Sequence, residues 1–187
     1  IRLNACDTPV TDWTRPLSGR KALVTGAARG IGASIAETLA RDGADVILLD
    51  VPPAKTDLDA LAARLGGRSI TLDICAEDAA TQLVEALPDG IDIVVHNAGI
   101  TRDKTLANMT PEFWDAVLAV NLNAPQVLTK ALLDNGTLRD HGRVILLASV
   151  TEDPSSVLFA DDAGEPDASR YRDDAFGFYS TEGLRGL

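Results

Sequence analysis

The chain has 187 residues, 45% of them hydrophobic, which is enough for one folded domain with a sizeable core. Its formal net charge of −11 argues against nucleic acid and anionic membranes as partners. No apolar run is expected to span a membrane. The chain begins at Ile1 with no recognisable targeting signal and is expected to be a fragment or a processed chain.

Apolar strand-like runs alternate with helical stretches from residue 20 to residue 149. The predicted strands are KALVT (21–25), DVILLD (45–50), SITLD (69–73), IDIVVHNAG (91–99) and GRVILLAS (142–149). The predicted helices cover 31–43, 57–67, 76–90 and 110–136. Thr110 is the expected N-cap of the last helix, with Pro111 in its first turn, and Pro125 is expected to bend or split it.

This alternation predicts an α/β fold, a doubly wound parallel sheet of the Rossmann type that ends after the fifth strand. Residues 1–19 carry two prolines and no hydrophobic period and are expected to be a linker or arm. Residues 20–149 are the predicted dinucleotide-binding domain. In residues 150–187 acids outnumber bases nine to three, which predicts an acidic loop and an incomplete C-terminal segment.

The stretch TGAARGIG joins the first predicted strand to the first predicted helix. Gly26 lets the chain turn sharply, Gly30 lets the backbone approach a pyrophosphate, and Gly32 lets helix and strand pack closely. The helix start then offers free N–H groups to phosphates. Arg29 and Ile31, which lie beside Gly30 in this loop, are also predicted to bind the cofactor. A glycine-rich turn without a ligand is the alternative reading.

Acids follow the second and third predicted strands, at the edge where a doubly wound sheet binds its ligand. Asp50 can accept hydrogen bonds from a ribose 2′-hydroxyl and repels a 2′-phosphate, which predicts NAD(H) as the preferred cofactor. NADP(H) is the alternative that Arg29 favours, and a solvated turn acid is the other reading of Asp50. Asp73 is expected either to bond the adenine or to cap the next helix.

The segments TGAARGIG, NAGITRD, VNLNAPQVLTKALL and GRVILLAS together resemble the short-chain dehydrogenase/reductase family. They are most similar to its 3-oxoacyl-(acyl-carrier-protein) reductases of the high-molecular-weight actinobacterial type, whose linker the stretch TDWTRPL also resembles. The resemblance covers about residues 11–150. It implies a nicotinamide cofactor, with the three glycines at the pyrophosphate, Asp50 at the adenosine ribose and Asp73 at the adenine.

The resemblance also implies roles for residues at the later strand ends. Asn97, Ala98 and Gly99 would line the cofactor cleft, and Asn121 would order the water of a proton relay. Ser149 would hydrogen-bond the substrate carbonyl.

Two further expectations concern histidine and metal. His96 stands where the family more usually has asparagine, and it is expected to be a histidine with its hydrogen bonds satisfied at a strand end. No metal site is predicted.

The catalytic tyrosine is the point at which the resemblance weakens. The family places it 13 residues after the serine, where this sequence has Asp162. Tyr179, in a stretch that resembles a helix start, is the predicted catalytic tyrosine, with Tyr171 as the alternative. Gly183 follows Tyr179 at the place of the family lysine, and no lysine follows Lys130. Insertion, truncation and divergence all remain open as explanations.

The predicted activity is NAD(P)H-dependent reduction of 3-oxoacyl thioesters of acyl carrier protein or CoA to 3-hydroxyacyl thioesters, impaired in this chain. The alternatives are a catalytically incomplete cofactor-binding module and an extended-type epimerase or dehydratase acting on a nucleotide sugar. The expected partners are a small acyl thioester and a second copy of the chain, packed through the long predicted helix. Cys6 and Cys75 are expected to be free thiols in a reducing cytoplasm, with a single bridge as the alternative.

Overall fold

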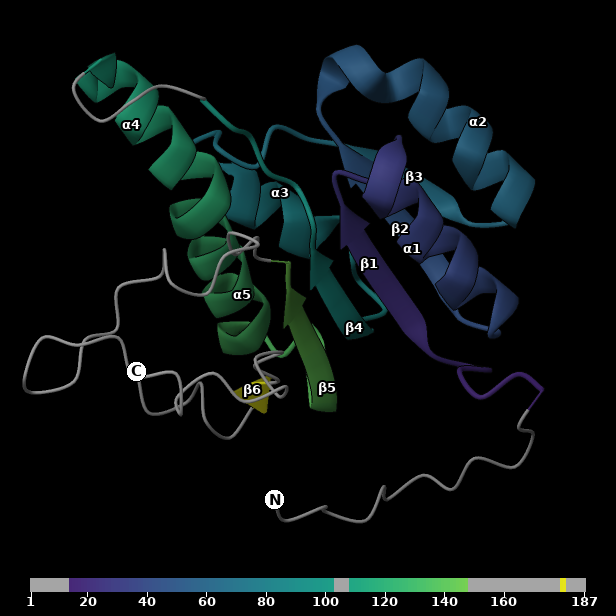
Figure 1. The fold of residues 1–187 in the computed structure, drawn as a ribbon. Helices are drawn as coiled ribbons and strands as arrows, with labels where there is room; N and C mark the ends of the chain where they lie inside the picture. The colour runs from purple at the N-terminus through teal and green to yellow at the C-terminus, as the bar shows by residue number, and fades with distance from the viewer. Residues whose placement is uncertain (1–13, 103–107, 148–178, 181–187) are drawn as a thin grey trace, which may run out of the picture.

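Five parallel strands form the centre of the sheet in the computed structural model, which describes residues 14–102 and 108–147 and the backbone of 179–180 (Figure 1). The strand order is β3-β2-β1-β4-β5-β6, and only β6 runs antiparallel to its neighbour. From β1 the chain builds the sheet towards one edge through β2 and β3. It then crosses back to the other side of β1 and builds towards the opposite edge through β4 and β5. The predicted doubly wound parallel sheet is therefore confirmed.

The first half of the chain follows the sequence prediction closely. Its elements are β1 (Lys21–Thr25), α1 (Gly30–Arg41), β2 (Asp45–Asp50), a 3₁₀ turn η1 (Pro52–Ala54), α2 (Lys55–Leu65) and β3 (Arg68–Thr71). The predicted bounds of β1 and β2 are the observed ones. Ahead of them, residues 14–19 turn against the end of α1, where the Leu17 N–H donates to the Asp42 carbonyl at 2.9 Å.

The second half departs further from the predicted bounds. Its elements are α3 (Ala79–Glu85), β4 (Ile91–His96), α4 (Pro111–Leu118), a π-helical segment η3 (Ala119–Asn123), α5 (Ala124–Asp134), β5 (Leu138–Leu146) and β6 (Tyr179–Ser180). The third helix is shorter than predicted, and β5 begins earlier. Tyr179 lies beside Val144 in the antiparallel β5–β6 pair, so the predicted helix start there is wrong.

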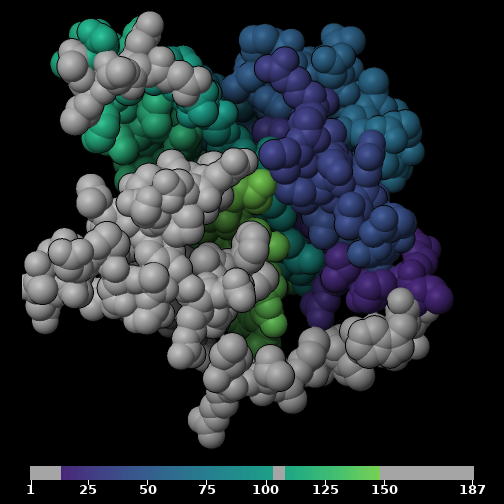
Figure 2. All heavy atoms as spheres, in the orientation of Figure 1, coloured from purple at the N-terminus to yellow at the C-terminus, as the bar shows by residue number. Residues whose placement is uncertain are grey.

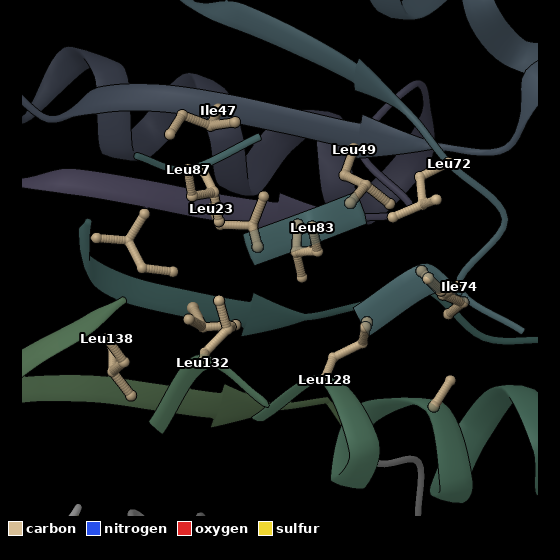
Figure 3. Packing of buried hydrophobic residues seen from close by; sticks show 14 of the residues in the cluster. Leu23, Ile47, Leu49, Leu72, Ile74, Leu83, Leu87, Leu128, Leu132 and Leu138 are labelled. Atoms are coloured by element: carbon tan, nitrogen blue, oxygen red, sulfur yellow. The ribbon is translucent and has the colours of Figure 1, made fainter. Parts of the chain in front are cut away.

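Successive residues of each central strand point into two different cores, because side chains alternate across a sheet. Leu23 packs with α3 and α5, and its neighbours Ala22 and Val24 pack with α1 and α2. Figure 3 shows the first of these cores, in which strand residues such as Leu23 belong to one cluster with Leu83 of α3 and Leu132 of α5. Both faces are covered, which explains why the strands read as continuous apolar runs.

The helical run from Pro111 to Asp134 begins as predicted, but a π-helical segment interrupts the α-helix in its middle. The Thr110 hydroxyl accepts a hydrogen bond from the Phe113 N–H at 3.3 Å, which confirms the N-cap, and Pro111 takes the first turn. The π segment ends at Asn123, directly before α5, and Pro125 lies in the first turn of α5. Pro125 therefore divides the run into two α-helices joined by a wider turn.

The same run contradicts the expectation that no segment is long and apolar enough to span a membrane. By length and composition alone, Pro111–Asp134 passes that test, with a mean hydropathy of 1.2 and 28% of the tested window buried. Its inner face, which includes Leu128 and Leu132, packs on the sheet, as core helices of soluble proteins also do.

Strand β5 contains an irregular turn that the hydrophobic pattern did not predict. Leu138 pairs with Ile91, yet Arg143 pairs with Ile93, so the segment between them bulges out of the ladder. His141 there has a φ of 60°. Beyond the bulge β5 runs straight to the carboxyl edge, where its lime-green end reaches the surface (Figure 2). Leu146 and Leu147 there are 46% and 40% exposed.

Candidate functional site

A cleft of about 430 Å³ opens at the carboxyl ends of β1, β2, β3 and β4. Its lining comprises Gly26, Arg29, Gly30, Leu49, Asp50, Val51, Leu72, Asp73, Ile74, Asn97, Ala98, Gly99, Ile100 and Val120. Eight of the ten predicted cofactor residues are among them. Of the other two, Gly32 is buried inside α1, and Ile31 lies on the outer side of that helix with 67% of its surface exposed.

The larger apolar side chains of this lining were not predicted. Leu49, Leu72 and Ile74 flank Asp50 and Asp73 at the strand ends, and Val120 comes from the π segment. Leu49, Leu72 and Ile74 could have been predicted, because each is next in sequence to Asp50 or Asp73, which were already assigned to the site. Nothing in the sequence pattern brought Val120 to the cleft, because its position depends on how the helical run packs.

The three glycines of the loop after β1 meet different demands. Gly26 has a φ of 63°, and a Cβ on it would lie 2.8 Å from the Ala98 Cα. A Cβ on Gly32 would lie 2.1 Å from the Gly26 carbonyl oxygen. Gly30 has a φ of 59° and no heavy atom within 4 Å of a built Cβ. Gly26 and Gly32 therefore permit close packing, and Gly30 leaves backbone open to a ligand.

The N-terminus of α1 is available to an anion. Arg29 is its N-cap residue in extended conformation, and no side chain caps the helix there. The first turn also contains no acidic residue. Its free N–H groups and the positive end of the helix dipole favour a phosphate group at this position.

Asp50 fastens the glycine loop to the end of β2. Its Oδ2 accepts a hydrogen bond from the Ala28 N–H at 2.9 Å, and its Oδ1 accepts one from the Val51 N–H at 2.8 Å. The carboxylate is therefore oriented before any ribose hydroxyl arrives. The bond to Ala28 was not predicted, because it depends on the pairing of β1 with β2.

Asn97 and Thr25 form a network that joins β4 to the glycine loop. The Thr25 hydroxyl accepts hydrogen bonds from the Asn97 and Ala98 N–H groups at 3.1 and 3.0 Å. The Asn97 Nδ2 donates to the carbonyls of Thr25 and Gly26, both at 3.0 Å. The Asn97 side chain thus supports the loop, and Gly99 and the backbone around it face the cleft.

Asn121 holds the segment after β4 against the helical run. Its Oδ1 accepts from the Ile100 N–H and its Nδ2 donates to the Ile100 carbonyl, each at 2.9 Å. Its own carbonyl would receive the N–H of residue 125 in an α-helix, but Pro125 has none. The sequence therefore removes the α-helical donor of this carbonyl at the edge of the cleft.

His96 is buried at the end of β4, with 4% of its surface exposed. Its Nε2 shares a hydrogen bond with the Thr129 hydroxyl oxygen at 2.8 Å. Burial lowers the pKa of His96 to about 4, so the imidazole is neutral near pH 7. This agrees with the expected histidine whose hydrogen bonding is satisfied at a strand end.

The remaining predicted site residues divide into those near the cleft and those the structure does not place. Asp73 lines the cleft, and its Oδ1 accepts from the Cys75 N–H at 2.9 Å, which closes a local turn. Ser149 lies outside the described residues, and only the backbone of Tyr179 is placed. Within 14–102 and 108–147, no cluster of three or more His, Cys, Asp or Glu side chains is arranged to hold a metal.

Comparison with known proteins adds family evidence to this geometry. The family model described as enoyl-(acyl carrier protein) reductase matches residues 26–156. Nodulation protein G of Rhizobium sp. (strain N33) is 45% identical over 72% of the chain and 56% of its own length. Hydroxyacyl-CoA dehydrogenase ChsB1 of Mycobacterium tuberculosis is 43% identical over 66% of the chain and 42% of its own length. The 3-oxoacyl-(acyl-carrier-protein) reductase FabG of Escherichia coli (strain K12) is 38% identical over 71% and 55%.

Solved structures of similar fold also point to this family. A blue fluorescent protein from a metagenomic library, in complex with NADPH, is 34% identical, with a TM-score of 0.65 over 71% of this chain and 57% of that one. A short-chain dehydrogenase from Shigella flexneri is 33% identical, with a TM-score of 0.63 over 71% and 56%. The chain spans about half the length of the relatives it matches. The matched motifs and the shared sheet establish that the chain belongs to the short-chain dehydrogenase/reductase family.

Proposed function

We propose that this protein is an NAD(P)H-dependent reductase that converts 3-oxoacyl thioesters of acyl carrier protein or CoA to 3-hydroxyacyl thioesters. The observation that carries the cofactor part is the cleft at the carboxyl edge of the sheet. There an open Gly30, an uncapped helix and an oriented Asp50 provide places for a pyrophosphate and a ribose. The names of relatives 38% and 43% identical support the thioester substrate.

The proposed chemistry divides between the cofactor and the residues of this chain. When bound, a reduced nicotinamide supplies a hydride to the substrate carbonyl carbon. Ser149 would donate a hydrogen bond to the carbonyl oxygen, and Tyr179 would give it a proton. The Asn121 carbonyl, which lacks its α-helical donor, would hold a water that resupplies this proton.

Turnover by this chain is expected to be slow. No lysine follows Lys130, so none stands near Tyr179 in sequence to lower its pKa from the usual value of about 10. Loss of one positioned acid–base group typically costs on the order of a hundred- to ten-thousand-fold. With acetoacetyl-CoA and the reduced cofactor that each protein binds more tightly, we expect single-turnover rates at least about a hundredfold below those of the E. coli reductase named above.

Two variants separate the proposed enzyme from a cofactor-binding module without turnover. Ser149→Ala and Tyr179→Phe should each reduce the residual rate while NADH binding, followed by fluorescence, stays unchanged. Cofactor binding with a rate that neither variant changes would support the binding module. Rapid turnover that Tyr179→Phe abolishes would contradict the expected impairment.

We also propose that Asp50 makes NADH the preferred cofactor. A 2′-phosphate would meet a carboxylate held in place by Ala28 and Val51, and like charges at close range repel. Asp50→Asn removes the charge and keeps an oxygen acceptor, so it should improve NADPH affinity by about tenfold, which corresponds to about 1.4 kcal/mol. Fluorescence titration with both reduced cofactors measures the change.

A matched control lies in the same cleft. Asp73→Asn should change the affinities for NADH and NADPH by the same factor, because Asp73 is proposed to lie at the adenine, which both cofactors share. Tighter binding of NADPH than NADH by the unaltered chain would refute the preference, and Arg29 would then be the residue that decides it.

We propose further that two copies of the chain associate through the outer face of α4, η3 and α5. This face exposes large apolar side chains: Phe113, Trp114, Leu122 and Val127 are 37%, 50%, 56% and 55% exposed. Trp114→Glu should shift the protein towards monomer in light scattering, and Ala63→Glu on the exposed side of α2 should not. A monomer before any substitution would contradict this interface. Cys75 is an exposed free thiol, and it supports the cytoplasm as the proposed location. Cys6 lies outside the described residues, so its state stays a prediction.

A further inference from the structure

His96 is a buried polar residue that the proposed reaction does not use. It ends β4, and its imidazole is enclosed between the sheet and α5, where Thr129 is its hydrogen-bond partner at 2.8 Å. Thr129 is also buried, with 9% of its surface exposed. A buried polar pair costs free energy unless the bond between its members is kept, so this contact fixes the distance between β4 and α5 at one point.

The residue stands where three parts of the site meet. Its carbonyl accepts a hydrogen bond from the Leu147 N–H at 3.0 Å, at the end of the strand that leads to Ser149. The next residue, Asn97, supports the carbonyls of Thr25 and Gly26 in the glycine loop. The imidazole itself reaches α5, which continues the helical run that carries Asn121.

The segment that follows His96 is therefore attached to the helical run at both of its ends. The His96–Thr129 bond holds the near end, and the paired bonds between Ile100 and Asn121 hold the far end. Between them lie Asn97, Ala98 and Gly99, which line the cleft. A shift of the near end would move Asn97, and with it the support of the glycine loop.

We propose that His96 is a positioning residue for the reductase. Through Thr129 it sets the place of segment 97–100 against α5, and so it aligns the cofactor cleft with the helix that carries Asn121. The functional importance of this role rests on the proposed function. The positioning itself does not require a cofactor and can be measured without one.

The test is amide hydrogen exchange in the cofactor-free chain. The Ala98 N–H donates to Thr25 and the Ile100 N–H donates to Asn121, so both amides report on the segment. Thr129→Val removes the hydroxyl and keeps the shape, and it should speed exchange of these amides at least about tenfold more than exchange of β1 amides. Thr129→Ser, which keeps a hydroxyl, should restore slow exchange.

Two controls separate positioning from general loss of stability. Leu132→Ala, one turn further along α5 and fully buried, should lower the melting temperature without selective exchange in segment 97–100. His96→Gln, which carries a side-chain amide in place of the imidazole, should protect the segment better than His96→Leu. Uniform exchange changes in Thr129→Val, matching those of Leu132→Ala, would overturn the proposal.

Cofactor titration of the same variants then tests the link to function. Thr129→Val should weaken NADH binding about fivefold, and Leu132→Ala should not change it. Selective exchange with unchanged NADH affinity would overturn the role in the reductase. Failure of the unaltered chain to bind either cofactor would refute the proposed function, whereas the exchange data would still decide whether His96 positions the segment.

Discussion

Replacing Gly32 with alanine is expected to abolish cofactor binding and to lower the free energy of unfolding by about 3 kcal/mol. The added Cβ would lie 2.1 Å from the Gly26 carbonyl oxygen and 2.5 Å from the Asn97 Nδ2. The first of these is a backbone atom of the loop that would bind the pyrophosphate, so it cannot rotate aside as a flexible side chain does. Relief of the clash requires α1 to move away from the loop, and that separates the helix N-terminus from the phosphate site.

Urea denaturation and fluorescence titration with NADH measure the two effects. Gly66→Ala is the matched control, because Gly66 ends α2 with a φ of 66° and has no heavy atom within 4 Å of a built Cβ. It should cost about 1–2 kcal/mol through backbone strain alone and leave NADH affinity unchanged. If Gly32→Ala binds NADH as tightly as Gly66→Ala does, the close packing of α1 is not what forms the site.

Replacing Asp92 with asparagine is expected to lower the free energy of unfolding by about 3 kcal/mol without changing cofactor affinity. Asp92 is buried near the amino edge of the sheet, opposite the cleft, with 6% of its surface exposed. It accepts hydrogen bonds from the Arg20 and Arg139 guanidinium groups at 3.0 and 2.9 Å, and from the Lys21 N–H at 2.9 Å. Asparagine leaves two cations without their buried counter-charge.

The effect of Asp92 should also depend on pH. Burial by itself raises the pKa of Asp92, but the Lys21 N–H and the two arginines outweigh burial and lower the pKa below its usual 3.8. The folded form therefore binds its proton less readily than the unfolded form. The stability that Asp92 contributes is complete above about pH 4, and it is lost as the pH falls through the folded pKa.

Urea denaturation at pH 7 and pH 3 tests both statements. The difference between the unaltered chain and Asp92→Asn should shrink on acidification. Asp134→Asn, which removes an exposed partner of Lys130 on α5, should cost only a few tenths of a kcal/mol at pH 7. An equal effect of the two variants would show that the ion pairs of the buried Asp92 contribute no more than a surface pair.

The sequence predicted the features that depend on the local pattern of apolar, polar and capping residues. Apolar runs bounded by polar residues marked β1 and β2 at their observed ends, and Thr110 with Pro111 marked the start of α4. The strand ends also predicted where the cleft lies. These features depend on residues within one element, so hydrophobic period and capping chemistry are sufficient to find them.

The structure departs from the prediction where contacts between segments far apart in sequence determine the local geometry. The bulge in β5 follows from its pairing with β4, and Thr25 reaches Asn97 across 72 residues of sequence. The bond from Asp50 to Ala28 spans 22 residues and has no local signature. Tyr179 was assigned a helix start by resemblance, whereas its backbone extends along the edge of β5. A motif transferred from a family cannot show which neighbour its residues have in this chain.

The network between Thr25 and Asn97 has a consequence for the order of events in folding. Strands β1, β2 and β3 are neighbours in sequence, and their pairing closes short loops. The glycine loop, however, receives its support from a residue 72 positions away, so a long loop must close before that support exists. A nascent chain that has not yet produced β4 therefore has the glycine motif without the Asn97 support, and the proposed nucleotide site is complete only when β4 docks against β1.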